Sequence, residues 1–235
     1  MGWASRIKAM LPTGAKKAAR FLWWNLRAPY YRVQYGAWPP PYWTELAGYE
    51  SLIQIIKDHN LLSIAGDLVE VGTFCGGGTY RLANFLRRMR SEKRLYAIDI
   101  FDADTDRTEN SKKDSMAHIY RGILQRKSQG EVFKQITRGL KNLVVIAADS
   151  KEVCLPSSVV CFAFIDGNHS PEHVESDFYL VWQKLLPGGV VAFHDYGFDL
   201  PQVTATLDML CAKHRQEIID TRVLGAEHIL AIRKR

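Results

Sequence analysis

The chain has 235 residues, of which 47% are hydrophobic and 24% are charged. These values fit a globular domain with a sizeable core and exclude an intrinsically disordered chain. No apolar run reaches the length of about 18 residues that a membrane span needs, the N-terminus lacks the apolar stretch of a secretory signal, and the four cysteines show no metal-binding spacing. We therefore expect a cytoplasmic protein.

The net charge of +6 belongs to one segment. Residues 1–35 carry seven basic side chains and no acidic one, which leaves 24 basic against 25 acidic residues in the rest of the chain. The segment also contains Trp23 and Trp24, and three prolines follow it at 39–41. We predict that residues 1–43 form a basic aromatic arm that packs on the body or on a second subunit of a homo-oligomer, or that lies on an anionic membrane face. Nucleic-acid binding is disfavoured, because the body adds no basic surface.

Residues 44–235 are predicted to form one α/β domain. Thr44 is a candidate N-cap for a first helix over 44–60. Apolar runs typical of parallel strands buried on both faces then alternate with helical patterns. The strands are expected at 67–72, 94–99, 143–148, 161–166 and 189–194, and the helices at 79–90, 112–137, 171–186 and 201–214. Two last runs, 217–223 and 228–233, are separated by a short link that favours an antiparallel hairpin at the sheet edge.

The segment 67–78, DLVEVGTFCGGG, joins a predicted strand to a glycine turn and a helix N-terminus. Such a turn is a seat for a ligand at the carboxyl end of a parallel sheet. A dinucleotide-binding GxGxxG motif would need its first glycine where Glu70 stands, and no Gly-Lys-Ser/Thr of a P-loop follows. The turn around Gly72, Gly76 and Gly77 therefore favours a flat, charged ligand without a phosphate.

Acidic residues stand at the carboxyl ends of five successive strands, which is the edge where open parallel sheets bind ligands. They are Glu70, Asp99, Asp149, Asp166 and Asp195. In nucleoside-binding sheets, an acid at the position of Asp99 accepts hydrogen bonds from the ribose hydroxyls. Asp149 or its neighbour Ser150 is placed to reach an adenine edge, whereas Glu70 is expected to organise the glycine turn or to face a cationic group.

The segment from Asp166 to His169 and the pair His194-Asp195 follow neighbouring strands. Asp166 and Asp195 are expected to reach one hard divalent cation such as Mg²⁺ or Mn²⁺. His169 has a side chain suited to a general base, or else caps a turn. His194 is a candidate metal ligand or a hydrogen-bond partner of a nearby loop. The acids at 102, 104 and 106 are expected only to solvate a loop.

These motifs resemble the class I S-adenosylmethionine-dependent methyltransferases, and most of all the macrocin O-methyltransferase type, which is related to catechol-type metal-dependent enzymes. The resemblance covers about residues 45–235. It is carried by VEVGTFCGG at 69–77, by AID at 97–99, and by IDGNH at 165–169 continuing through Asp177 and Trp182 to LPGG at 186–189 and FHDY at 193–196.

The resemblance implies a Rossmann-like, doubly wound seven-stranded sheet whose last strand is antiparallel. It also implies that the cofactor's methionine part lies on the turn made by Gly72, Thr73, Phe74, Gly76 and Gly77, with the ribose at Asp99. Asp166 would touch both cofactor and metal, Asp195 would be a metal ligand, and His169 would be the base. Relatives often have paired acids where this chain has His194-Asp195, so the choice of metal is open.

Three functions follow from these patterns. The first is O-methylation of a hydroxyl of a sugar, glycolipid or secondary metabolite, favoured because no Asn/Asp-Pro-Pro-Tyr/Phe motif of N-methylation follows the fourth strand. The second is hydroxylation on the same fold, which some relatives are assigned. The third is a non-catalytic scaffold held on a membrane or partner by the arm.

Overall fold

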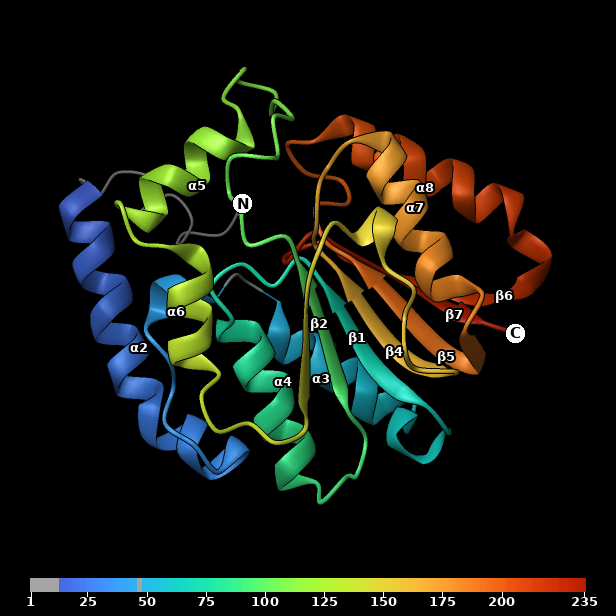
Figure 1. The fold of residues 1–235 in the computed structure, drawn as a ribbon, viewed down its shortest axis with the longest axis horizontal. Coiled ribbons are helices and arrows are strands. Elements are labelled where there is room, and N and C mark those ends of the chain that lie inside the picture. Colours follow the sequence, from blue (N-terminus) through green and yellow to red (C-terminus); the bar gives the residue numbers. More distant parts are fainter. Residues whose placement is uncertain (1–12, 46–47) are drawn as a thin grey trace.

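The computed structural model describes residues 13–45 and 48–235, so the first twelve residues of the predicted arm and positions 46–47 of the predicted first helix lie outside the described part. Seven strands form one sheet in the order β3-β2-β1-β4-β5-β7-β6 (Figure 1). Their bounds are β1 Asp67–Val71, β2 Leu95–Asp99, β3 Leu143–Ala147, β4 Val160–Ile165, β5 Leu185–Phe193, β6 Ile218–Leu224 and β7 Ile229–Lys234.

The pairing of the strands confirms the predicted α/β, Rossmann-like architecture. Strands β3, β2, β1, β4 and β5 are parallel neighbours, whereas β7 runs antiparallel to both β5 and β6. The chain order reverses between β1 and β4, and the carboxyl ends of these strands form the crevice where such sheets bind ligands. The predicted terminal hairpin is β6–β7, and β7 inserts beside β5 so that β6 becomes the edge strand.

Helices cover both faces of the sheet (Figure 1). Residues of α3 and α4 pack with one face of the strands, and residues of α7 and α8 pack with the other. The α-helices are α2 Thr13–Tyr35, α3 Tyr49–Asp58, α4 Gly77–Arg88, α5 Met116–Leu124, α6 Gln129–Ile136, α7 Pro171–Trp182 and α8 Pro201–Lys213, and the 3₁₀ turns are η1 Tyr42–Thr44, η2 Leu61–Ser63, η3 Ser150–Glu152 and η4 Arg215–Glu217. None of the helices in the described ranges is long and apolar enough to cross a membrane.

Three predicted helix boundaries are wrong. The helix expected over 112–137 is two helices, because Gln125 and Arg126 have positive φ and Ser128 then caps α6. Thr44 is not an N-cap, since its hydroxyl donates to the Pro41 carbonyl in a 3₁₀ turn. The helix expected to reach residue 186 ends at Trp182, and the Pro-Gly-Gly segment at 187–189 lies inside β5, where the pairing with β4 shifts register.

The part of the predicted arm that the structure describes is mostly one helix, α2, packed on α4. Tyr31 and Tyr35 of α2 are buried in the core shared with α3 and α4. Arg81 of α4 is buried beneath α2, with its guanidinium 4.7 Å from the Tyr31 ring centroid and its Nε 2.7 Å from a Glu45 oxygen. Cation–π contacts and this buried ion pair fix α2 to the domain.

Candidate active site

The turn after β1 passes very close to the end of β4, and a glycine makes this approach possible. Gly72 has a φ of +78°, and a Cβ there would lie 2.0 Å from the Asp166 carbonyl oxygen. Its N–H donates to the Ile98 carbonyl, so the turn is tied to β2 on one side and to the end of β4 on the other. Only glycine allows both the left-handed backbone and this close approach.

Asp99, at the end of β2, organises that turn. One carboxylate oxygen accepts the backbone N–H groups of Thr73 and Phe74 at 2.7 and 2.9 Å. The other accepts the Phe101 N–H and the Gln129 side-chain amide at 2.6 and 3.2 Å. Burial raises the pKa of Asp99, while these hydrogen bonds oppose the rise by favouring the carboxylate. Asp99 therefore positions the glycine turn as well as facing the space above it.

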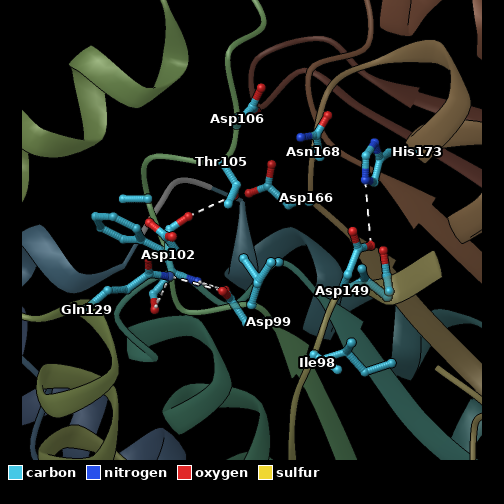
Figure 2. A pocket seen from close by; sticks show the side chains of 18 of the residues that line it. Ile98, Asp99, Asp102, Thr105, Asp106, Gln129, Asp149, Asp166, Asn168 and His173 are labelled. Atoms are coloured by element: carbon cyan, nitrogen blue, oxygen red, sulfur yellow. Dashed lines mark hydrogen bonds and ion pairs between the residues drawn. The ribbon is translucent and has the colours of Figure 1, made fainter. Parts of the chain in front are cut away.

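A cavity of about 230 Å³ lies above the carboxyl ends of β1, β2 and β4. Figure 2 shows Asp106, Asp166 and Asn168 on one side of it and Asp99 with Gln129 on another. Six of the predicted site residues line it, namely Gly72, Phe74, Asp99, Asp149, Ser150 and Asp166. Five of the lining side chains are carboxylates, Asp99, Asp102, Asp106, Asp149 and Asp166. This lining favours a ligand with positive charge and disfavours a phosphate.

Four predicted cofactor residues support the site from outside the cavity, and one of them is Thr73, whose N–H and hydroxyl donate to Asp99. Glu70 is fully buried, and its two oxygens accept the hydroxyls of Tyr49 and Thr79, each at 2.6 Å. Burial raises the pKa of Glu70 to about 7. Gly76 and Gly77 begin α4, where a Cβ would collide with Phe133 or with the Thr44 backbone. Glu70 thus takes the organising role rather than facing a ligand.

His169 lies behind the cavity wall between two carboxylates. Its Nδ1 is 2.5 Å from Asp106 Oδ2, and its Nε2 is 2.9 Å from Asp195 Oδ2. Burial opposes the charged ring, but hydrogen bonds to Asp106 and Asp195 outweigh it and raise the pKa of His169 to about 10. The two carboxylates therefore favour the protonated ring of His169 at neutral pH.

His194 forms a second cation–carboxylate group beside the first. Its Nδ1 is 3.3 Å from oxygens of both Asp166 and Asp195. Burial again opposes the charged ring, but Asp166 and Asp195 raise the pKa of His194 to about 11. Asp195 is buried, yet its hydrogen bond with His169 and its close approach to the charged His194 hold its pKa well below the usual range. Asp195 also has a φ of +60°, a conformation that few non-glycine residues adopt.

Asp166, His169 and Asp195 could hold a metal ion, because one ligand atom from each lies within 4.8 Å of the others. Two carboxylates and an imidazole suit a hard divalent cation with water in the remaining positions. Asp106 on the other ring nitrogen is the partner that metal-bound histidines commonly have. The residues present therefore fit such an ion. His194, predicted as a ligand, lies outside this group of three, and His169 joins it.

The expectation that the acids at 102, 104 and 106 only solvate a loop holds for one of them. Asp104 pairs with Arg121 at the surface. Asp102 lines the cavity, and Asp106 is buried against His169. Tyr120 and Gln129, which were not predicted as site residues, also line the cavity, from α5 and α6. Their sequence signal was weak, since the predicted helix over 112–137 had no break to place them at the sheet edge.

A sheet of this order with an acid-lined cavity over the glycine turn defines the class I S-adenosylmethionine-dependent methyltransferases. A family model described as a methyltransferase domain matches residues 69–196, and the chain belongs to this family. It is therefore a methyltransferase with S-adenosylmethionine as its cofactor. No curated protein matches the chain significantly.

Solved structures show the same fold. The chain is similar to the O-methyltransferase NovP, with a TM-score of 0.64 and 20% identity over 79% of this chain and 78% of that one. It is also similar to CalS11, a TDP-rhamnose 3′-O-methyltransferase of calicheamicin biosynthesis, with a TM-score of 0.57 and 14% identity over 96% of this chain and 97% of that one.

Proposed function

We propose that the enzyme transfers the methyl group of S-adenosylmethionine to a hydroxyl of a sugar, free or carried by a glycolipid or a secondary metabolite. The observation that carries this proposal is His169, held between Asp106 and Asp195 directly behind the cavity wall that Asp106 and Asp166 line. Oxygen methylation needs a group that takes the hydroxyl proton, and an oriented histidine is suited to this task. The sugar as acceptor is supported by the likeness to CalS11, whose substrate is a nucleotide-linked sugar.

The cofactor fits the cavity by charge and by shape. The sulfonium is positively charged. The cavity is lined by carboxylates at the ends of β2 and β4, the two strands on either side of β1. Asp99 and the Gly72 turn would hold the ribose and the methionine part, and Asp149 with Ser150 would face the adenine. Methyl transfer is an in-line displacement, so these residues act mainly by aligning the methyl group with the acceptor oxygen and excluding water.

A divalent cation held by Asp166 and Asp195 would supply Lewis acidity toward the acceptor hydroxyl. His169 would serve either as its third ligand or as the base, because only Nε2 faces this group. The charge of the cation would also oppose the proton that His169 carries when only carboxylates surround it, and so lower the pKa of that ring. Where the cation engages the two carboxylates alone, His169 with Asp106 on Nδ1 has Nε2 free to accept the hydroxyl proton. Both roles require Asp106 to keep the ring oriented.

The test is a transfer assay with the full chain, methyl-labelled S-adenosylmethionine and a panel of nucleotide sugars that includes TDP-rhamnose, with either magnesium or a chelator present. We expect label on a sugar oxygen and a loss of turnover of about 10²–10⁴-fold in His169→Gln, with cofactor affinity retained. The chelator should suppress turnover, and Asp166→Asn should no longer bind magnesium. Absence of cofactor binding, or label on nitrogen acceptors alone, would contradict the proposal.

A further inference from the structure

Helix α2 is apolar on two opposite sides. One side, with Tyr31 and Tyr35, packs against α4. The other side carries Leu22, Leu26 and Val33, whose spacing of four and seven residues places them on one stripe of a helix. Their exposed fractions are 61%, 72% and 72%. We call this stripe, together with the exposed Trp23 and Tyr30 that flank it, the outer face of α2.

The outer face is bordered by arginines. The Arg27 guanidinium lies 4.7 Å from the ring centroid of Trp23 and 5.6 Å from that of Tyr30. Arg27 is half-buried and also pairs with Glu50 of α3, at 3.4 Å. Arg32 is exposed and lies 4.7 Å from the ring centroid of the exposed Trp38. In sequence, residues 1–44 contain seven basic residues and no acidic one, and the following domain does not share this excess. Apolar side chains, aromatic rings and arginines therefore lie together on and beside α2. Figure 1 shows this helix at one side of the domain.

We propose that the outer face of α2 docks the enzyme on a membrane surface that contains anionic phospholipids. Leucine and valine would enter the boundary of the acyl chains, tryptophan and tyrosine prefer the level of the headgroups, and the arginines would meet the lipid phosphates. Contiguous exposed apolar surface rimmed by polar groups is typical of such a contact.

Charge decides between a membrane and a second copy of the chain. A two-fold symmetric contact sets the same patch of both copies face to face. Such a contact through α2 would bring two acid-free, cationic segments together, whereas an anionic lipid surface neutralises them. The buried Arg81, paired with Glu45 and stacked on Tyr31, keeps the helix attached to the domain, so the outer face is already formed before docking.

The proposal is tested by co-sedimentation of the full chain with vesicles of phosphatidylcholine containing about 30% phosphatidylserine. We expect the protein to pellet with these vesicles and to remain in solution with pure phosphatidylcholine, and we expect binding to weaken as salt increases. Arg32→Gln should weaken binding about fivefold, since one cation near the surface is worth about 1 kcal/mol. The double variant Leu26→Glu, Val33→Glu should weaken it by about tenfold or more.

Val223→Glu is the matched control, because Val223 is an exposed apolar residue on the edge strand β6, at the opposite side of the domain from α2 (Figure 1). It should bind vesicles as the wild type does. All variants should keep the wild-type Tm and affinity for S-adenosylmethionine, which excludes unfolding as the cause. The proposal is overturned if the wild type does not bind anionic vesicles, or if the double variant binds them as tightly as the wild type does. A dimer that Leu26→Glu dissociates, without vesicle binding, would instead assign the face to a second copy.

Discussion

Asp106→Asn tests the environment of His169 directly. The pKa of His169 lies at about 10 rather than 6.5 because Asp106 and Asp195 outweigh the cost of burial. With comparable hydrogen bonds on the two ring nitrogens and unchanged burial, removing one carboxylate should lower this pKa by more than half of its rise. The amide oxygen can still accept a hydrogen bond from Nδ1, and the volume is unchanged. The amide NH2 then faces the Thr108 N–H that Asp106 Oδ1 accepts, which adds a loss of stability that does not vary with pH. The charged ring then loses about 2–3 kcal/mol of stabilisation.

The dependence on pH follows from the direction of the shift. Because the pKa of His169 is higher in the folded than in the unfolded chain, its contribution to stability is complete below about pH 6.5 and is lost as the pH rises through about 10. Asp106→Asn should therefore reduce the free energy of unfolding of the metal-free protein most at pH 6–7, by about 2–3 kcal/mol beyond the constant loss. This pH-dependent part of the difference from wild type should vanish above about pH 10.

NMR titration of the His169 ring and urea unfolding at several pH values measure these quantities. Asp104→Asn is the matched control, because Asp104 lies in the same loop but pairs with Arg121 at the surface. It should change the stability by less than about 1 kcal/mol. A wild-type His169 that titrates near 6.5, or an Asp106→Asn variant whose stability loss is the same at all pH values, would refute the reasoning.

Two further predictions concern the turn and its support. Gly72→Ala should abolish binding of S-adenosylmethionine in calorimetry, because its Cβ would lie 2.0 Å from the Asp166 carbonyl and the turn must shift; normal affinity would disprove the role of the turn. Tyr49→Phe should lower the free energy of unfolding by about 1.5–3 kcal/mol, since the buried Glu70 loses a donor at 2.6 Å. Tyr196→Phe, which removes an exposed bond to Asp208, should cost less than about 1 kcal/mol, and equal costs would contradict the importance of burial.

The sheet and one edge of the site could be predicted because both have local signals. Each parallel strand is a short apolar run, and Asp99, Asp166 and Asp195 directly follow three of them. The sheet then brings these chain-distant acids together at its carboxyl edge. The glycine turn could be predicted for a similar reason. Gly72 has a positive φ, a conformation that other residues rarely adopt, so such a turn is marked by glycine in the sequence.

The remaining features depend on contacts that no local pattern reports. Asp106 stands in a loop, and its partner His169 is 63 residues further along the chain. Glu70 had two expected roles, and only its contacts with Tyr49 and Thr79 decided between them. The helix α2 contains Pro29 and apolar residues on two sides, so its sequence showed neither a simple amphipathic pattern nor the face that packs on α4.

The most direct measurement is a crystal structure of the full chain with S-adenosylhomocysteine and magnesium. It should place the ribose at Asp99, the amino-acid part of the ligand on the Gly72 turn, and the sulfur toward Asp166, with the ion among Asp166, His169 and Asp195. A ligand bound at the amino ends of the strands, or a cavity that remains closed to it, would contradict the assignment of this crevice as the methyl-transfer site.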